Sequence, residues 1–165
     1  MARTIDVLLV DDRSVDADVT LFALRQAAKS DVKLLRLKSG DEALRCLFAV
    51  GEFAQRPAGM PGLVLLDVDM PAMSGLCVLD VIRAHPATSS LRVVLLGTDG
   101  RPRVWGQDGF AADGYLVKSQ DFDQYCASIE LTLKRWLPRI VSGRQQERQQ
   151  SYVWPAVERL TLGSV

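Results

Sequence analysis

Mostly apolar runs alternate along the chain with stretches in which apolar residues recur every three or four positions. The runs are short and rich in Val, Ile and Leu, which is typical of strands buried on both faces of a parallel sheet. They predict strands at residues 5–10, 32–37, 63–66, 91–96 and 114–117.

The segments between these runs show helical spacing. They predict helices from Ser14 onward and at residues 39–50, 76–84 and 121–137. Ser14 and Asp41 are the candidate N-caps of the first two helices. The predicted buried face of the first helix consists of Val15, Val19, Phe22 and Ala23.

The segment between the last two predicted strands, "DGRPRVWGQDGFAADG", has room for one more helix. It contains Pro102, Gly106 and Gly109. A helix interior is destabilised by about 1 kcal/mol for each Gly and about 3 kcal/mol for a Pro. Only a short or distorted helix is therefore predicted there.

Strands that alternate with helices predict an α/β fold, a doubly wound five-stranded parallel sheet with helices on both faces. In such sheets ligands bind beyond the carboxyl ends of the strands, where the strand order reverses. The residues at or just past the predicted strand ends are therefore the candidate site residues. They are Asp11, Asp12, Asp67, Asp69, Gly97, Thr98 and Lys118.

The carboxylates of this set are expected to bind a cation. Two carboxylates about 5 Å apart repel by roughly 3 kcal/mol at an effective dielectric constant near 20. Oxygen ligands without His or Cys suit Mg²⁺, and a divalent cation with Lys118 beside a nucleophilic carboxylate would suit phosphoryl transfer. The alternative is that the aspartates are helix caps and solvated loop residues, which for Asp69 alone is an equally good explanation.

Composition narrows the class of protein. The 165 residues are 48% hydrophobic and carry 20 basic and 20 acidic side chains, so charge gives no indication of a nucleic-acid or membrane partner. Cys46, Cys77 and Cys126 form no CxxC pair and are predicted to be small buried side chains. No signal peptide is recognisable and no apolar run approaches the roughly 18 residues of a membrane span, so we expect a cytoplasmic protein.

Three motifs in order along the chain, "LLVDD", "LVLLDVDMPAMSGL" and "GYLVKS", resemble the receiver domain of two-component response regulators. The segments "CLFAVGEFAQRP" and "DFDQY" are similar to those of single-domain receivers associated with bacterial phytochromes. The resemblance covers about residues 5–137. It implies the flavodoxin-like receiver fold, with a receiver domain at 1–138 and a C-terminal tail at 139–165.

This resemblance implies a stand-alone protein that accepts a phosphoryl group from a sensor histidine kinase of the phytochrome type. It would signal by protein–protein interaction and would not be an enzyme. Asp67 would be the phosphoacceptor and Lys118 its cationic partner. Mg²⁺ would be held by the side chains of Asp11, Asp12 and Asp67 and by the backbone carbonyl of Asp69.

The switch region departs from the family pattern. Receivers carry Thr or Ser directly after the fourth strand, where this chain has Gly97, with Thr98 one position later. Tyr115 takes the place of the aromatic switch residue, which that hydroxyl draws inward upon phosphorylation. Ser119 follows Lys118 where receivers carry a proline. We therefore expect phosphorylation to shift Tyr115 only weakly.

Two other functions remain open. A receiver that has lost phosphorylation would be an interaction module, which Gly97 and Ser119 favour. A haloacid-dehalogenase-like phosphatase also carries "DVD" after an apolar strand, but on its first strand, whereas two predicted strands precede Asp67 here. The tail, with Tyr152 and Trp154, is expected to dock on its own domain or on a second subunit of a homodimer.

Overall fold

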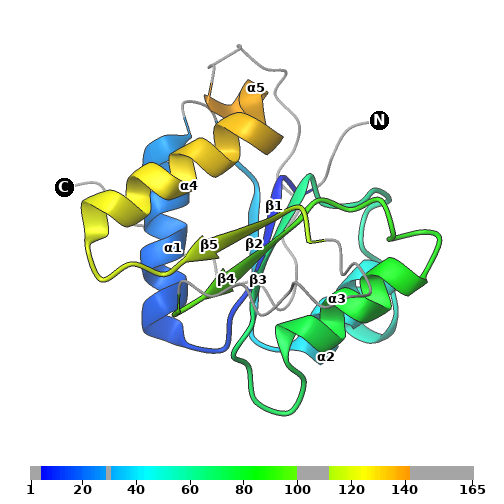
Figure 1. Cartoon of the computed structure of the whole chain (residues 1–165). Helices are drawn as coiled ribbons and strands as arrows, with labels where there is room; N and C mark the ends of the chain where they lie inside the picture. The colour runs from blue at the N-terminus through cyan, green and yellow to red at the C-terminus, as the bar shows by residue number, and fades with distance from the viewer. Residues whose placement is uncertain (1–4, 29–30, 100–111, 142–165) are drawn as a thin grey trace.

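The computed structural model of the chain describes residues 5–28, 31–99 and 112–141. In this part of the chain, parallel strands form a five-stranded sheet in the order β2-β1-β3-β4-β5 (Figure 1). The strands are β1 (Val7–Val10), β2 (Leu34–Leu37), β3 (Leu63–Asp67), β4 (Val93–Gly97) and β5 (Gly114–Val117). The predicted doubly wound α/β fold is confirmed, although β1, β2 and β4 begin later than predicted.

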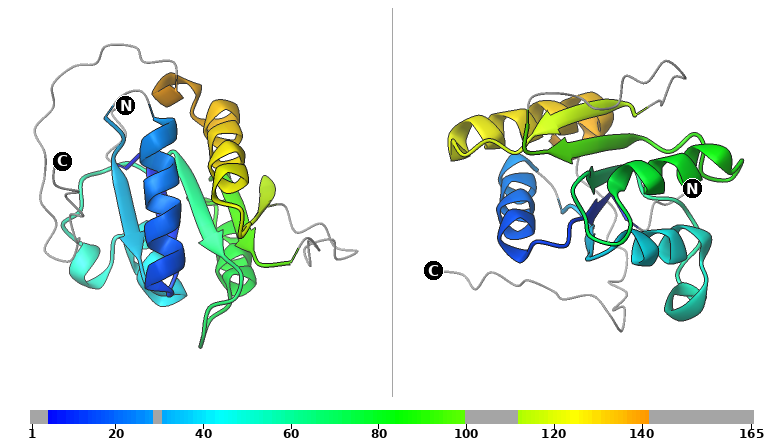
Figure 2. Two further views of the ribbon diagram at one scale, coloured as in Figure 1. Left: turned by 90° about the vertical axis from the view of Figure 1, so that its left-hand side faces the viewer. Right: turned by 60° about the horizontal axis from the view of Figure 1, so that its bottom comes forward.

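Helices cover both faces of the sheet, as Figures 1 and 2 show. One face carries α1 (Ser14–Ala27), α4 (Phe122–Trp136) and the short α5 (Pro138–Val141). The other carries α2 (Gly40–Phe48), the 3₁₀ turn η1 (Gly51–Phe53) and α3 (Gly75–Ala84). The helices bury apolar stripes against the strands, and each large side chain so buried contributes about 1.5–3 kcal/mol.

Successive residues of a central strand alternate between the two cores. In β1, Val7 and Leu9 pack beneath α1 and α4, whereas Leu8 and Val10 face α2 and α3. None of these four side chains is more than 1% exposed. Because both faces are covered, the central strand β1 is an unbroken apolar run in the sequence, whereas the edge strand β2 contains the half-buried Arg36.

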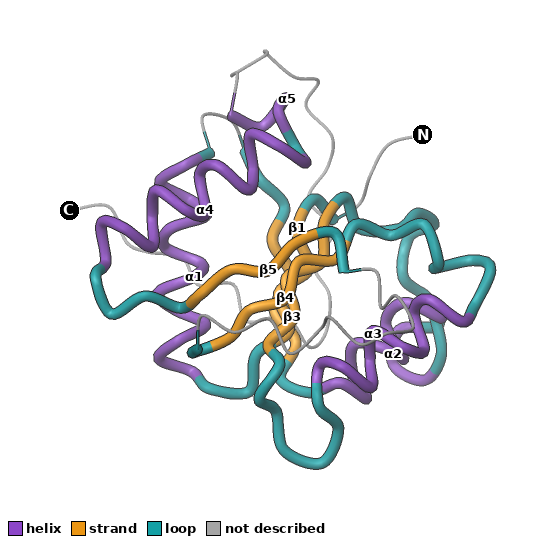
Figure 3. Tube along the Cα trace, in the orientation of Figure 1, coloured by secondary structure: helices purple, strands orange, loops and turns teal. Residues whose placement is uncertain are grey.

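The strand order reverses at β1. The chain runs from β1 to β2 on one side of the sheet and then to β3 and β4 on the other. The loops beyond the carboxyl ends of β1 and β3 lead to helices on opposite faces, α1 and α3 (Figure 3). This is the edge at which sheets of this kind bind their ligands.

Two helix starts differ from the sequence prediction. Ser14 is the first residue of α1 rather than its cap, since the N-cap is Arg13, whose side chain makes no capping hydrogen bond. In α2 the cap is Ser39, whose hydroxyl accepts from the backbone N–H of Glu42 at 3.2 Å. Asp41 lies within the first turn, where its charge still favours the helix N-terminus.

The buried face of α1 also differs. Val15 is 75% exposed and Phe22 is 38% exposed, so the prediction for these two residues is wrong. Ala17 and Thr20 lie on the buried stripe instead. The fully buried hydroxyl of Thr20 lies 2.8 Å from that of Tyr125 in α4. This hydrogen bond satisfies both groups and explains why α1 turns a polar residue toward the core.

The loop after α2 is held by Arg56. Its guanidinium group donates hydrogen bonds to the carbonyl oxygens of Cys46 (2.6 Å), Leu47 (3.0 Å) and Gly59 (2.5 Å). A cation that satisfies the last carbonyl groups of a helix stabilises its C-terminus. Arg56 therefore fixes the segment in which the resemblance to phytochrome-associated receivers was noted.

The prediction for the cysteines is correct only in part. Cys46 is buried, and burial raises the pKa of its thiol to about 11. Cys126 is half-buried, but Cys77 is exposed on the surface of α3. Helical spacing alone therefore did not predict which cysteine of an amphipathic helix faces solvent.

Several predicted features fall on residues that the structure does not describe. The short or distorted helix predicted before the last strand falls mostly on residues 100–111, and the predicted tail falls mostly on residues 142–165. The described start of the tail forms α5, where Ile140 is buried and Arg139 pairs with Asp6 at 2.9 Å. None of the helices described in 5–28, 31–99 and 112–141 is long and apolar enough to cross a membrane.

Candidate functional site

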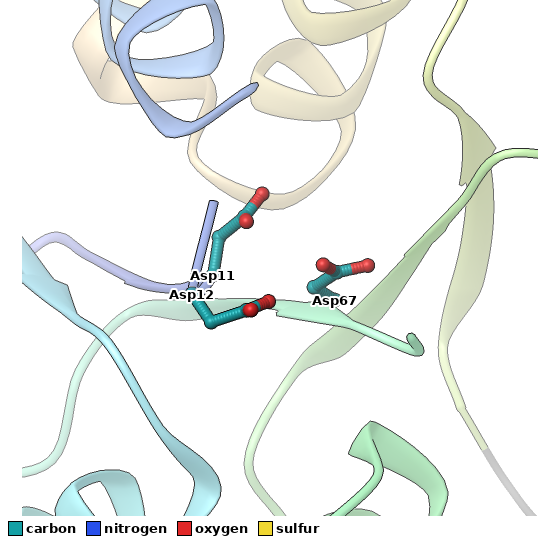
Figure 4. Close-up of side chains that lie close together, drawn as sticks. All are labelled: Asp11, Asp12 and Asp67. Carbon is teal, nitrogen blue, oxygen red and sulfur yellow. The ribbon is translucent and has the colours of Figure 1, made fainter. Parts of the chain in front are cut away.

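Three aspartates meet beyond the carboxyl ends of β1 and β3. Asp11 and Asp67 are fully buried and Asp12 is half-buried. Carboxylate oxygens of the three side chains all lie within 4.8 Å of one another, and Figure 4 shows the side chains gathered at this edge. The structure thus brings together three of the residues that the sequence singles out.

The backbone around Asp67 is fixed from two sides. The register of β1 and β3 places Asp11 beside it. Gly75, the first residue of α3, donates its N–H to the Val68 carbonyl at 3.1 Å and packs on the Asp67 backbone. A Cβ atom at residue 75 would overlap the Asp67 carbonyl oxygen and lie 2.9 Å from its carbonyl carbon, so this close approach needs glycine.

Lys118 reaches the aspartates from the loop after β5. Its Nζ lies 2.7 Å from Asp11 Oδ2 and 3.1 Å from Asp67 Oδ2, and its side chain is only 9% exposed. Burial acts to lower the pKa of this amine, but the hydrogen bond and the charge of Asp11 outweigh it, so the pKa of Lys118 is raised. The residue is a charged ammonium group at neutral pH.

The negative charges of the cluster favour the binding of a further cation. Burial raises the pKa of Asp11 above its ordinary value, more than the hydrogen bond from Lys118 lowers it. Asp12 Oδ1 is buried, with no hydrogen-bond partner among the described residues. A buried polar atom without a partner is costly, and oxygen donors alone suit a hard divalent ion. Asp11, Asp12 and Asp67 therefore fit a divalent cation.

Two charged residues of the site were missed in the sequence. Asp16 Oδ2 lies 3.3 Å from Lys118 Nζ and 2.8 Å from Arg13 Nη2. Arg13 Nη2 lies 4.0 Å from Asp67 Oδ2. Arg13 is the N-cap of α1 and Asp16 lies in its first turn, directly after the acidic pair. The sequence shows that both residues are near the site but not which way their side chains reach.

The switch residues lie beside one another, but in a manner the sequence did not reveal. The Tyr115 ring lies against Gly97, and a Cβ atom there would overlap its hydroxyl oxygen and lie 2.6 Å from Cζ. The Tyr115 hydroxyl donates to the Asp99 carbonyl oxygen at 2.8 Å. The ring thus occupies the space that a side chain at residue 97 would fill.

Thr98 and Ser119 have other partners. The Thr98 hydroxyl lies 3.5 Å from Asp69 Oδ2, and both side chains are exposed. Ser119 accepts from the backbone N–H of Asp121 at 3.1 Å and donates to Gln124 Oε1 at 2.8 Å. Ser119 therefore stabilises the start of α4. Asp69 donates its backbone N–H to Asp67 Oδ1 at 3.3 Å.

A parallel α/β sheet of this strand order, with buried aspartates and a lysine at its carboxyl edge, defines a class of signalling domain. The family model for the response regulator receiver domain matches residues 7–130 of the chain. The chain belongs to this family, and the resemblance noted in its motifs is confirmed.

Particular relatives are other response regulators. Response regulator Rcp1 of Synechocystis sp. (strain ATCC 27184 / PCC 6803 / Kazusa) is 27% identical over 135 residues, 81% of this chain and 90% of Rcp1. The Mn²⁺-bound structure of Rcp1 aligns with a TM-score of 0.71 at 28% identity, over 81% of this chain and 94% of that chain.

Two further structures are similar. The phosphorylated cyanobacterial phytochrome response regulator RcpA has a TM-score of 0.66 at 25% identity, over 82% of this chain and 95% of its own. The bacteriophytochrome response regulator RtBRR has a TM-score of 0.68 at 29% identity, over 84% of this chain and 87% of its own.

Proposed function

We propose that this receiver accepts a phosphoryl group from a sensor histidine kinase onto Asp67 in a Mg²⁺-dependent reaction. One observation carries the proposal. The fully buried Asp67 carboxylate lies between the Lys118 ammonium group, 3.1 Å away, and a carboxylate cluster that fits a divalent cation. With a divalent cation bound by this cluster, the Asp67 carboxylate would be a nucleophile with positive charge on both sides.

The transfer step follows from this arrangement. A carboxylate oxygen of Asp67 attacks the phosphorus of a phosphohistidine, and an O–P bond forms as the P–N bond breaks. The electron pair of that bond stays on the imidazole nitrogen, which takes a proton from solvent. Lys118 neutralises charge on the phosphoryl oxygens. Mg²⁺, held by Asp11, Asp12, Asp67 and the Asp69 backbone carbonyl, would supply further positive charge there.

The partner is inferred from the relatives. Rcp1, RcpA and RtBRR are response regulators, two of them described as phytochrome or bacteriophytochrome response regulators. A phytochrome-type histidine kinase is therefore the proposed phosphodonor. The output is proposed to be a protein–protein contact rather than catalysis of a further reaction.

A second candidate function is that of an interaction module with the receiver fold but without a response to phosphorylation. Tyr115 lies over Gly97 in the position that a side chain would need, which favours an interaction module whose shape does not depend on phosphorylation. The two candidates make different predictions, because only the first requires a labelled Asp67.

Intact-mass spectrometry after incubation with acetyl phosphate and Mg²⁺ tests the proposal. The wild-type protein should gain one phosphoryl group, and EDTA should prevent the gain. Asp67→Asn preserves the size of the side chain but removes the nucleophile, so it should gain none. Labelling of this variant to the wild-type extent would contradict the assignment of Asp67, and a wild-type protein that never labels would favour the interaction module.

A further inference from the structure

Arg13 stands at the mouth of the acceptor site. Its guanidinium Nη2 lies 4.0 Å from Asp67 Oδ2, the same oxygen that lies 3.1 Å from Lys118 Nζ. Its own side chain is 44% exposed, whereas that of Asp67 is fully buried. The guanidinium group is therefore close to the proposed acceptor and exposed enough to turn toward a phosphoryl group attached to Asp67.

The local contacts hold Arg13 in this place. Its backbone N–H donates to Asp11 Oδ1 at 2.9 Å, and its Nη2 lies 2.8 Å from Asp16 Oδ2. Asp16 also lies 3.3 Å from Lys118 Nζ. The two cations of the site are thus joined through one carboxylate that is itself not fully buried.

A cleft opens beside these residues. It has a volume of about 450 Å³, and its lining includes Arg13, Asp16, Thr98 and Lys118. Both cations that approach Asp67 therefore face a space large enough for a phosphoryl group. The rest of the lining comes from α1, the loop after β5 and the start of α4. Asp67 is not among the lining residues, so the cleft adjoins Asp67 through Arg13 and Lys118.

The net charge of the site depends on Arg13. The carboxylates of Asp11, Asp12, Asp16 and Asp67 face the cations of Lys118 and Arg13. A bound divalent cation would make these charges balance. An acyl phosphate on Asp67 adds about one negative charge, which leaves the site with a net charge of about minus one. Without Arg13 this net negative charge would be twice as large.

Besides the Lys118 ammonium group, the described residues of the site offer no hydroxyl donor at the end of β4. Gly97 offers no hydroxyl, the space beside it holds the Tyr115 ring, and the Thr98 hydroxyl faces Asp69. A guanidinium group carries several N–H donors in a planar fork that matches phosphoryl oxygens.

We propose that Arg13 is a phosphoryl-binding residue, which turns from Asp16 to the phosphoryl group on Asp67 and supplies the donor that residue 97 lacks. The inference rests on the proposed function, since it requires an acceptor at Asp67. Arg13 lies outside the carboxylate cluster, so metal binding alone does not need it. Its contribution begins only when the phosphoryl group or a mimic is present.

Beryllofluoride, a mimic of the phosphoryl group, distinguishes a role of Arg13 in phosphoryl binding from a role in metal binding. Isothermal titration of the wild-type protein with beryllofluoride in Mg²⁺ should show binding. Arg13→Ala should bind the mimic about tenfold more weakly, the effect of a charge-assisted hydrogen bond discounted for the exposure of the side chain. Its Mg²⁺ affinity without beryllofluoride should stay within about twofold of wild type or increase, because a positive charge is lost.

Two variants serve as controls. Arg13→Lys retains the charge but not the fork and should recover part of the loss. Arg45→Ala removes an arginine of similar exposure, 38%, that pairs with Asp41 of α2 and with Glu52 of η1. This change should alter neither titration.

The outcomes are distinguishable. Wild-type protein that binds no beryllofluoride in Mg²⁺ would contradict the proposed function itself. Wild-type binding with an unchanged Arg13→Ala affinity would overturn the role of Arg13 and leave the acceptor in place. A parallel loss of Mg²⁺ and beryllofluoride affinity in Arg13→Ala would show a structural role and would overturn the inference as well.

Discussion

Two halves of the carboxyl edge of the sheet can be compared. In the acceptor half, which consists of Asp11, Asp12, Asp67 and Lys118, charge decides the arrangement: oppositely charged groups lie as little as 2.7 Å apart in a buried setting. In the switch half, which consists of Gly97, Thr98 and Tyr115, shape decides it. The Tyr115 ring fills the space that Gly97 leaves open.

The comparison shows that the groups needed for phosphoryl transfer can be present at an edge of the sheet where the hydroxyl of the switch is missing. The acceptor half has the groups that a receiver needs for phosphoryl transfer. The switch half has no hydroxyl at residue 97, and its aromatic ring already lies against β4. We therefore expect the position of Tyr115 to depend only weakly on the chemical state of Asp67.

The largest effect is expected from Asp12→Ala. The buried, unpartnered Asp12 Oδ1 should become a metal ligand, and its removal should cost more than the roughly 10- to 100-fold in affinity typical of residues that only support a ligand. A Mg²⁺ titration followed by Trp fluorescence measures this affinity. The metal-free variant should also unfold at higher temperature, because one carboxylate of a crowded set is gone. An unchanged titration would remove Asp12 from the site.

Gly97→Ala should test the shape of the switch half. The new Cβ atom would overlap the Tyr115 hydroxyl, and overpacking of this kind costs about 1–3 kcal/mol in the free energy of unfolding. Urea denaturation measures the loss. Adding Tyr115→Ala should make Gly97→Ala nearly neutral, since the clashing ring is gone.

Gly114→Ala is the matched control. It also adds a Cβ atom to a strand glycine, but at 3.4 Å from Val94 Cγ2, close to an ordinary contact distance. Its cost should be small and independent of Tyr115. Equal costs for Gly97→Ala with and without the Tyr115 ring would show that the ring does not occupy this space in solution.

Tyr115→Phe should have a smaller effect. It removes the hydrogen bond to the Asp99 carbonyl oxygen, 2.8 Å long, and leaves the ring over Gly97. A loss of about 0.5–1.5 kcal/mol in unfolding free energy is expected. Thermal or urea denaturation gives the value, and a loss as large as that of Gly97→Ala would mean that the hydrogen bond, not the shape, holds the ring.

Thr98→Ala should have the smallest effect. The Thr98 hydroxyl makes one exposed contact with Asp69 at 3.5 Å, so the change in unfolding free energy should stay within about 0.5 kcal/mol. The NMR shift of the Tyr115 ring upon addition of beryllofluoride should be weak in both this variant and wild type. A large shift in wild type that Thr98→Ala abolishes would show that Thr98 supplies the missing hydroxyl.

The sequence predicted the sheet and the clustering of Asp11, Asp12 and Asp67 because both depend on local pattern. An apolar run that ends in Asp67 places a carboxylate at the edge of a parallel sheet wherever that strand lies. The position of Tyr115 over Gly97 depends on a contact between two strands, and neither residue indicates it alone. Arg13 was missed for a similar reason, since its role depends on which way a long side chain reaches.

The face of α1 shows the same limit. Periodicity placed Val15 inward, but the helix is rotated so that Thr20 meets Tyr125. A hydrogen bond between residues far apart in the chain outweighed the exposure of one valine. Sequence patterns predict that a helix has a buried face more reliably than they predict where that face lies.

Gly75 has a consequence for how the sequence can drift. Any side chain there would overlap the carbonyl oxygen of Asp67. Every change in the first two bases of a glycine codon introduces a side chain or a stop codon, so only the third base of this codon can vary harmlessly. Random mutation can therefore distort the backbone of Asp67 from an uncharged position that takes no part in the chemistry. If Asp67 accepts a phosphoryl group as proposed, a lineage that keeps every charged residue of the site could still lose this function through residue 75.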